Sequence, residues 1–427
     1  MRTFSHVYRH SKVIARTVAV IVLLVLAGMP TGAAADTTAP VPLLKSGQPV
    51  DWWFMFKLNA GTFPGCGGDA QRVCLFGGDV QTEGYTHFGQ QFVYASSDNH
   101  VLQKGSGCAG DSVNDPLGAT FNEVYNGQYH YVVWNDQFYD DPKVSSGGTW
   151  GHSKGMLAWD DDGDGLVLQV TTPSWPAAAS AAHPRQSDGN TLGCVKDNDV
   201  EVSQHFFALK LTKDDVVKVL QALANASVVT DPSVVQVVNS GGPDEISSLV
   251  AALGRKVASR TALKLTLSSG VVLISKPSNL LVPPWQLVSA ELGGTDLRTA
   301  TWWMNPAIYS TTPETKIACW SDDLGHPGAV AIATSGAWDG TAFGLQGGNA
   351  PDRNHAKIGV SSSGDAHYTI FGDMNQQGTV SGVGTGKDKC AHSQNQRGGL
   401  FFVMDDKTLW TGVTDLIKGG TAPTTGP

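Results

Sequence analysis

Long apolar runs mark the first strands of the chain. Residues Trp52–Phe56 are wholly apolar, which predicts a central β-strand buried on both faces. Tyr129–Trp134 predicts a second buried strand, and this run ends in the polar cluster Asn135, Asp136 and Gln137. Binding groups often lie where a central strand ends. These three residues are therefore candidate substrate-binding residues, with an ordinary turn as the alternative.

A hairpin is predicted farther along. The strand Gly151–Trp159 is followed by the acidic turn Asp160–Gly165 and by a second strand, Leu166–Val170. Alternating aspartates before a glycine resemble a calcium loop, but Thr171 stands where an EF-hand has a bidentate glutamate. We therefore favour a solvated turn over a calcium site and expect no metal or other cofactor.

Helical spacing of apolar residues begins beyond residue 205. Lys213–Asn225 has apolar residues every three or four positions and two aspartates in its first turn. Pro243–Gly254 begins with proline and ends with glycine, as helices often do. Residues 205–265 are thus predicted to form a helical bridge. The elements expected after it are a hairpin (Ala262–Leu267 and Gly270–Ile274), a helix (Leu281–Leu292) and an aromatic strand (Thr299–Met304).

The first residues have the features of a secretory signal. A basic segment, a short apolar run and a small-residue site at Ala33–Ala35 predict a signal peptide over residues 1–35, cleaved after Ala35. The apolar run is shorter than the roughly 20 residues of a membrane span. We expect a secreted or periplasmic protein with no membrane segment beyond the signal.

The remaining chain, about 390 residues long, exceeds the usual length of one compact domain. We therefore predict an N-terminal half over 36–204 and a C-terminal half over 266–427. Abundant Gly (50), frequent Trp (12) and a low charged fraction (16%) suit a β-rich exported enzyme.

Net charge and cysteine count limit the possibilities further. The formal charge is −9, and removal of four basic and no acidic residues with the signal makes it −13. This argues against a basic surface that grips nucleic acid non-specifically. Six cysteines in an exported protein predict three disulfides, for which 15 pairings are possible. Proximity in sequence favours Cys66–Cys74. If the remaining bridges stay within the two halves, they are Cys108–Cys194 and Cys319–Cys390.

The strongest candidates for chemistry are two His-x-Lys tripeptides. Beyond residue 35 this pattern occurs at His152–Lys154 and at His355–Lys357. In a strand, residues two apart point to the same face, so each His projects beside its Lys. For a phosphodiester, two lysines can neutralise the phosphoryl oxygens, one histidine can attack phosphorus and the other can protonate the leaving oxygen. Histidines of ordinary half-exposed strands are the alternative reading.

The second copy repeats the setting of the first. Asn354–Val360 is followed by a turn at Gly364 and by the strand Tyr368–Gly372, which ends in Asp-Met-Asn375. The two histidines lie 203 residues apart (355 − 152), about half the mature chain. A weak internal duplication, in which each half supplies one His and one Lys, explains this spacing.

Six motifs in order resemble the deoxyribonuclease II family: Ser46-Gly-Gln-Pro-Val-Asp51-Trp, Asn135-Asp136-Gln137, Gly151-His-Ser-Lys-Gly155, Asp352–Lys357, Gly372-Asp-Met-Asn375 and Gln396-Arg-Gly-Gly399. The resemblance implies a mixed α/β, phospholipase-D-like fold, with two pseudo-symmetric halves that each have a central β-sheet flanked by helices. It also implies metal-independent hydrolysis of DNA through a phosphohistidine, leaving 3′-phosphate and 5′-hydroxyl ends. Whether the protein is a monomer or a homodimer stays open.

Residue by residue, the resemblance gives His152 the role of nucleophile and His355 that of general acid, with Lys154 and Lys357 beside them. Asn375 would hydrogen-bond a phosphoryl oxygen, and Asp160 would orient a catalytic group although it is displaced by one position. The family has Pro-Asn-Phe-Pro where this chain has Pro173-Ser-Trp-Pro176. The role of that Asn would therefore pass to Ser174 as a substrate-binding residue.

Two other functions remain open at this point. One is a phosphodiesterase of the same superfamily that acts on phospholipid or a small diester, and the other is a non-catalytic DNA- or carbohydrate-binding protein. If DNA is the substrate, protonation of histidines below about pH 6 would lessen the repulsion between the acidic chain and its substrate. The sequence therefore favours activity in acid.

Overall fold

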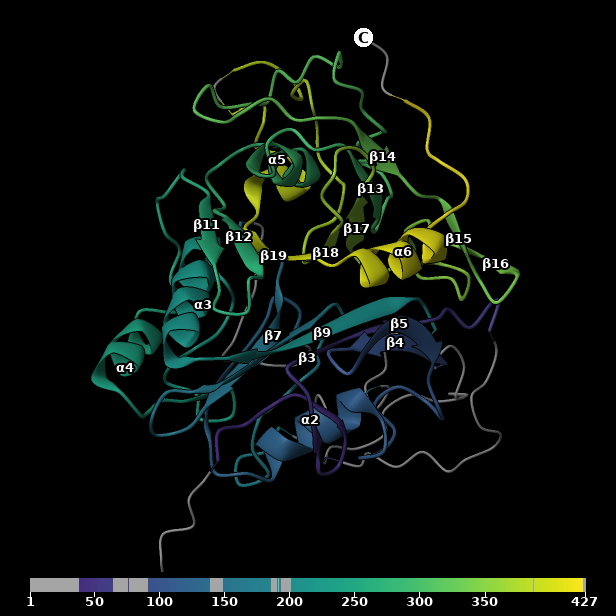
Figure 1. Ribbon diagram of the computed structural model, residues 1–427. Coiled ribbons are helices and arrows are strands. Elements are labelled where there is room, and N and C mark those ends of the chain that lie inside the picture. Colours follow the sequence, from purple (N-terminus) through teal and green to yellow (C-terminus); the bar gives the residue numbers. More distant parts are fainter. Residues whose placement is uncertain are drawn as a thin grey trace, which may run out of the picture. The chain divides into compact units, whose positions relative to one another are not determined.

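The computed structural model describes residues 38–63, 76, 91–138, 149–185, 190, 192, 201–386 and 388–424. The predicted signal peptide lies outside these residues. The chain from Ala39 onward forms one compact unit, built on one antiparallel and one mixed sheet (Figure 1).

The first sheet has eight strands in the order β10-β6-β7-β8-β9-β3-β4-β5, and all neighbours are antiparallel. Their bounds are β3 (Trp52–Lys57), β4 (Phe92–Ser96), β5 (Asn99–Lys104), β6 (His130–Asn135), β7 (Lys154–Trp159), β8 (Gly165–Val170), β9 (Gln204–Leu211) and β10 (Val238–Asn239). Every residue of β3, β7 and β8 is buried, which explains their nearly continuous apolar sequences. A short pair, β1 (Leu43–Lys45) and β2 (Gln48–Pro49), stands apart from this sheet.

The second sheet has seven strands in the order β11-β12-β19-β18-β17-β13-β14, and β13 and β14 are its parallel pair. Their bounds are β11 (Leu263–Thr266), β12 (Val272–Lys276), β13 (Leu297–Ala300), β14 (Val330–Ile332), β17 (Ile358–Ser361), β18 (Tyr368–Gly372) and β19 (Gly399–Asp405). A separate hairpin is formed by β15 (Ser335–Trp338) and β16 (Thr341–Gly344).

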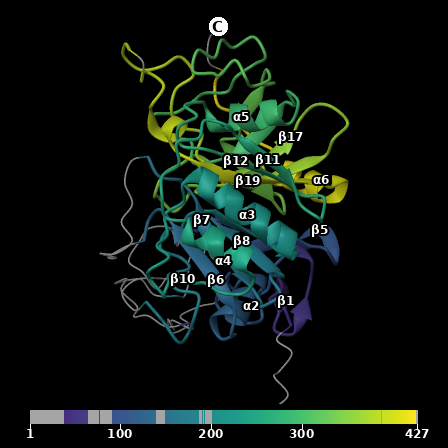
Figure 2. The ribbon, with the colours of Figure 1, turned by 90° about the vertical axis from the view of Figure 1, so that its left-hand side faces the viewer.

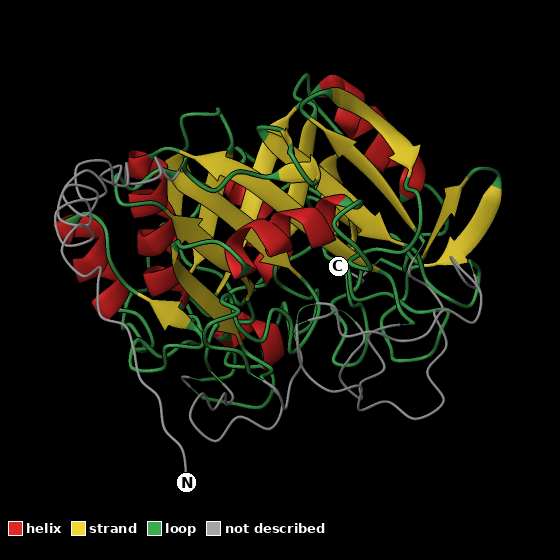
Figure 3. Cartoon of the chain, turned by 90° about the horizontal axis from the view of Figure 1, so that it is seen from below, coloured by secondary structure: helices red, strands yellow, loops and turns green. Residues whose placement is uncertain are grey.

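The helices lie around the sheets, as the view from below shows (Figure 3). Helix α2 (Pro116–Tyr125) packs against β1 and β3, and α5 (Pro284–Glu291) packs against β12 and β14. Helices α3 (Lys213–Ala226) and α6 (Lys407–Leu416) each contact strands of both sheets. Figure 2 shows α3 in this bridging position. Shorter elements are α4 (Asp244–Ala251) and the 3-10 turn η1 (Ser393–Gln396).

Aromatic side chains join the two sheets. The ring of Phe371 on β18 stacks on Phe207 of β9 and on Phe54 of β3, with centroid distances of 4.4 and 4.7 Å. Phe402 of β19 contacts Phe207 as well. All four rings are buried. Burial of several aromatic rings contributes strongly to the stability of the fold. These rings join the two sheets in one hydrophobic core.

The predicted mixed α/β class is confirmed, as are the central strands at β3, β6 and β7. The expected helical bridge over 205–265 is wrong at its beginning, because residues 204–211 form β9 in the interior of the first sheet. The run His205–Leu211 is buried except at Lys210, as suits a central strand. The aromatic strand expected over Thr299–Met304 ends at Ala300. The pseudo-symmetry of the two halves stays a prediction.

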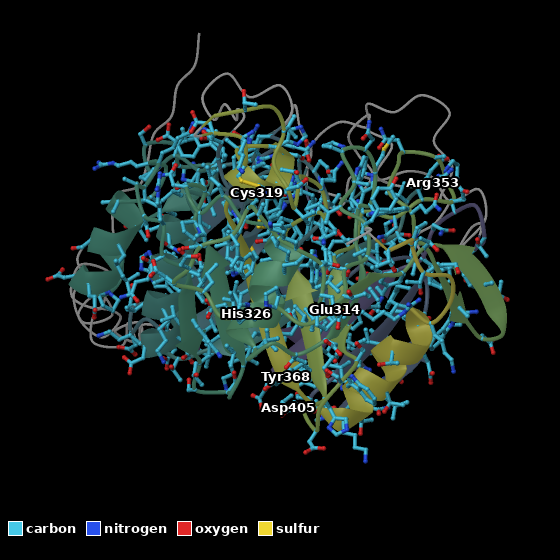
Figure 4. All side chains as sticks on the ribbon, turned by 90° about the horizontal axis from the view of Figure 1, so that it is seen from above. Glu314, Cys319, His326, Arg353, Tyr368 and Asp405 are labelled. Atoms are coloured by element: carbon cyan, nitrogen blue, oxygen red, sulfur yellow. A yellow bond between two sulfur atoms is a disulfide. The ribbon has the colours of Figure 1, made fainter. Side chains whose placement is uncertain are left out.

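One predicted disulfide, Cys319–Cys390, is confirmed, and Cys319 is labelled in Figure 4. Cys108 is also disulfide-bonded. The other cysteines named in the predicted pairs, Cys66, Cys74 and Cys194, lie outside the described residues. Among the residues that are described, no helix is long and apolar enough to cross a membrane.

Candidate active site

Each His-x-Lys motif lies at the start of a strand, one in each sheet. His152 and His355 precede these strands and do not lie within them. Lys154 is the first residue of β7, and Lys357 directly precedes β17. His152, Lys154, His355 and Lys357 are all buried, with 3–8% of their surfaces exposed. The positive charge of Lys357 acts on the imidazole of His152, so the structure brings the two motifs into one region.

A close backbone junction fixes the position of His152. The amide of His152 donates to the carbonyl oxygen of Gly398 at 2.8 Å, and the amide of Gly151 donates to Ser227. A Cβ added at Gly398 would lie 2.0 Å from the carbonyl oxygen of Ala226. That distance leaves room for glycine alone, so the close packing of the segment before β19 on the end of α3 requires the Gly398 of the Gln-Arg-Gly-Gly sequence.

The imidazole of His152 is held in one tautomer. Its Nδ1 lies 2.7 Å from the main-chain oxygen of Asp373. A carbonyl oxygen only accepts, so Nδ1 carries the proton and Nε2 keeps its lone pair. Burial lowers the pKa of His152 well below its usual value, and the attraction of Asp136 opposes this shift while the charges of Lys154, Arg397 and Lys357 add to it. The ring is therefore a neutral base.

Asp136 links Lys154 to a residue from the far end of the chain. Its Oδ1 accepts from Nζ of Lys154 at 2.5 Å, and its Oδ2 accepts from a guanidinium nitrogen of Arg397 at 2.7 Å. Burial would raise the pKa of Asp136, but Lys154 and Arg397 together hold it far below the ordinary aspartate value. Asp136 is thus a permanent anion that orients Lys154. The predicted role of direct substrate binding stays untested.

Arg397 was not predicted as a site residue. Its Nε donates to the main-chain oxygen of Trp150 at 3.0 Å, in addition to its bond with Asp136. The fully buried Lys276 donates to the carbonyl oxygens of Asn395 and Arg397, both at 2.8 Å. This buried amine fixes the loop that carries Arg397. The signal available in the sequence was the Gln-Arg-Gly-Gly motif, which named the segment without giving the arginine a role.

Asp373 was also missed. Its carboxylate accepts from Gln169 Nε2 and from the amide of Leu400, both at 3.0 Å. Burial raises the pKa of Asp373 to about 7, against the opposing hydrogen bonds from Ser153, Leu400 and Gln169 and the charge of Lys154. Through its main-chain oxygen the residue orients His152, and through its side chain it joins β8 to β19.

The second motif has different partners. The amide of His355 donates to the carbonyl of Ser203 at 2.8 Å. Its Nε2 lies 3.1 Å from the carbonyl oxygen of Gly348, and its ring meets Trp302 edge-on with centroids 4.1 Å apart. Nζ of Lys357 donates to the main-chain oxygen of His355 at 2.6 Å. The ring of His355 is thus held through Nε2, whereas that of His152 is held through Nδ1.

A third histidine supports Lys357. His205 on β9 is fully buried, and its Nδ1 accepts from the amide of Lys357 at 3.1 Å. This bond requires an unprotonated Nδ1. Burial lowers the pKa of His205 well below its usual value, and the charge of Lys357 lowers it further. Sequence reasoning could not have found His205, because 152 residues separate it from its partner.

Asn375 lies two residues beyond the carbonyl that holds His152. Its Nδ2 donates to Gln377 at 3.0 Å, and its Oδ1 is buried without a hydrogen-bond partner. A buried polar atom without a partner, next to the segment that holds His152, is consistent with a place for a substrate group or a water molecule.

Hydrogen bonds join the loops of three other predicted residues, Asn135, Gln137 and Ser174. Asn135 accepts from the amide of Gln137 at 2.8 Å and donates to the carbonyl of Trp175 at 3.3 Å. The amide of Ser174 donates to the carbonyl of Gln137 at 2.9 Å. Ser174 has a φ of 57°, in the left-handed region. These contacts fix the loop around Asp136, so the three residues act on its geometry.

Asp160 does not join the catalytic residues. It follows the last residue of β7, whereas Lys154 begins that strand, so roughly 20 Å of extended chain separates the two. Its carboxylate accepts from the amides of Asp162, Gly163 and Asp164. It therefore closes the turn. Within the described ranges, no group of three or more His, Cys, Asp or Glu is placed to hold a metal ion.

Comparison with known proteins shows the family of the chain. Residues 42–421 match the family model described as Deoxyribonuclease II. The chain is 22% identical to Cell-death-related nuclease 7 of Caenorhabditis elegans over 374 residues, which cover 85% of the chain and 83% of that relative. It is 30% identical to Deoxyribonuclease-2-alpha of Bos taurus over 158 residues, which cover 35% of the chain and 38% of that enzyme.

The candidate site thus combines a His-x-Lys motif at the start of β7 with one at the start of β17. The family match extends over most of the chain and includes both motifs. The chain therefore belongs to the deoxyribonuclease II family, and it is a deoxyribonuclease.

Proposed function

We propose that this deoxyribonuclease is a secreted endonuclease that cleaves DNA without a divalent metal, through a phosphohistidine on His152. The observation that carries the proposal is the hydrogen bond from His152 Nδ1 to the carbonyl of Asp373. It leaves Nε2 as a buried, neutral nucleophile. The proposal includes a two-half, phospholipase-D-like arrangement in which both halves contribute to one site.

The reaction has two steps. Nε2 of His152 attacks phosphorus, and the bond from phosphorus to the 5′-oxygen breaks as His355 gives that oxygen a proton. Water then attacks the phosphohistidine, the nitrogen–phosphorus bond breaks, and His355 takes a proton from the water. The products are a 3′-phosphate and a 5′-hydroxyl, and both histidines return to their starting states.

The remaining residues stabilise or position these groups. Lys154 and Lys357 neutralise the charge that develops on the phosphoryl oxygens, and Asn375 hydrogen-bonds one of them. Asp136 and Arg397 hold Lys154 in place. Protonation of histidines below about pH 6 lessens the net negative charge that repels DNA, and a general acid must carry its proton to act. Cleavage is therefore expected to be fastest in acid.

Plasmid cleavage in excess EDTA from pH 4 to 9 tests the mechanism, with His152→Ala, His355→Ala and the exposed control His326→Ala (Figure 4). We expect metal-independent cutting by the wild type and the control, 3′-phosphate ends, and loss of cutting in both active-site variants. Abolition of wild-type cutting by EDTA would overturn the metal-independent mechanism. A rate maximum above pH 8 would overturn the acid preference.

A further inference from the structure

One stretch of this acidic protein has the opposite charge. The whole chain has 38 acidic and 29 basic residues, but residues 246–290 contain five basic residues and no acidic one. Lys276 of this stretch is buried, whereas Arg255, Lys256 and Arg260 are exposed. All three lie in the coil that joins α4 to β11. Within the part of the chain that the structure describes, none of the three makes an ion pair.

This coil passes beside the first catalytic motif. Nζ of Lys256 donates to the hydroxyl of Thr149 at 2.5 Å and lies 5.2 Å from the ring centroid of Trp150. Trp150 precedes His152 by two residues, and its main-chain oxygen binds Arg397 at 3.0 Å. Lys256 is therefore in contact with the segment that carries the nucleophile.

Hydrogen bonds on both sides fix the course of the coil. The amide of Val257 donates to Ser227 Oγ at 3.1 Å, and its carbonyl accepts from Asn279 at 2.9 Å. The carbonyl of Ser227 in turn accepts from the amide of Gly151 at 2.8 Å. The three cations are thus presented from a backbone tied to the same junction as His152.

We propose that Arg255, Lys256 and Arg260 form a track for the phosphate backbone of duplex DNA beside the scissile bond. This inference rests on the proposed function. The five residue steps from Arg255 to Arg260 span at most about 17 Å of extended chain. This length equals the rise of about five base pairs. Cations along such a length replace counterions on successive phosphates and supply sequence-independent affinity. The track gives a protein of net charge −9 a local attraction for its polyanionic substrate.

The test measures binding rather than cleavage. A labelled 20-base-pair duplex is titrated in EDTA with the full-length His152→Ala protein, from 50 to 300 mM NaCl. One triple variant changes Arg255, Lys256 and Arg260 to Gln. A matched control changes Lys45, Lys104 and Lys407 to Gln; these residues are exposed and belong to β1, β5 and α6. Both triples alter the net charge equally.

We expect the track triple to raise Kd about tenfold or more at 50 mM NaCl and to flatten the salt dependence by about 0.9 per lost phosphate contact. The control triple is expected to leave both quantities unchanged. Arg255→Lys with Arg260→Lys keeps the charge and is expected to keep the salt dependence, which separates charge from misfolding.

Equal effects of the two triples would overturn the track. Failure of the His152→Ala protein itself to bind duplex DNA, together with failure of the wild type to cut it, would overturn the proposed function and the track with it. A protein that binds and cuts DNA but ignores the track substitutions would overturn the track alone.

Discussion

The two His-x-Lys motifs lie in different surroundings. In the first motif, Lys154 is paired with the carboxylate of Asp136, and His152 uses Nδ1 to bind a carbonyl. In the second, Lys357 is bound to the main-chain oxygen of its own histidine, and His355 uses Nε2. A duplicated pattern therefore does not imply duplicated chemistry. The two histidines are held by carbonyls from different segments, so the surroundings of each ring decide what it can do.

The largest effects are expected from the histidines themselves. His152→Ala removes the nucleophile and is expected to lower kcat by about 10⁴-fold or more on plasmid DNA. His355→Ala removes the proton donor, which contributes about 10²–10⁴-fold. On a thymidine 3′-(p-nitrophenyl phosphate), whose leaving group needs no proton, the first step of His355→Ala is expected to recover, as a p-nitrophenol burst. Recovery by His152→Ala instead would exchange the two roles.

Asp136→Asn tests the charge pairing that distinguishes the first motif. Removal of this anion leaves the buried Lys154 beside the partly buried Arg397 with no charge between them, so we expect the free energy of unfolding to fall by about 3 kcal/mol or more. Urea denaturation at pH 6 measures the change. The exposed Asp244→Asn serves as control and is expected to stay within about 0.5 kcal/mol of the wild type. An Asp136→Asn protein as stable as its control would show that the pairing is dispensable.

His205 offers the corresponding test of the second motif. His205→Leu leaves the buried amide of Lys357 without an acceptor, which costs about 1–3 kcal/mol, and we expect a ten- to hundredfold lower kcat. His205→Asn provides an oxygen in place of Nδ1 and is expected to retain most activity. Both variants are assayed for DNA cleavage across pH 4–7. If Leu and Asn behave alike, the hydrogen bond does not position Lys357.

The final prediction concerns stability and pH. The folded-state pKa of Asp373 is raised to about 7, so between pH 4 and 7 the folded protein holds a proton that the unfolded chain has lost. Stability contributed by this group therefore falls as pH rises through that window, by up to about 1.4 kcal/mol per pH unit. Asp373→Asn is expected to flatten this dependence in urea midpoints at pH 4.5, 6 and 7.5. An unchanged slope would contradict the assignment.

Much of the frame was predictable because strands and motifs are local signals. The apolar runs at Trp52 and Tyr129 needed no knowledge of distant contacts. Cys319–Cys390, 71 residues apart, followed from keeping disulfides within each half. Asp136 could be named from its place at a strand end, but not its bond to Arg397, which lies 261 residues away. Asp160 was proposed because the family resemblance has an aspartate near this position, but it lies at the opposite end of β7 from Lys154. A six-residue strand carries its two ends far apart.

The carbonyl of Asp373 and the carbonyl of Gly398 both fix His152, although they belong to the last part of the chain. A ribosome or an export channel releases these residues long after the first motif. On the proposed mechanism, an unfinished molecule therefore lacks the contacts that fix the tautomer of His152. It also lacks Arg397, which pairs with the Asp136 that holds Lys154. The producing cell would be exposed to cutting activity only after the chain is complete, so the folding order itself would protect the genome.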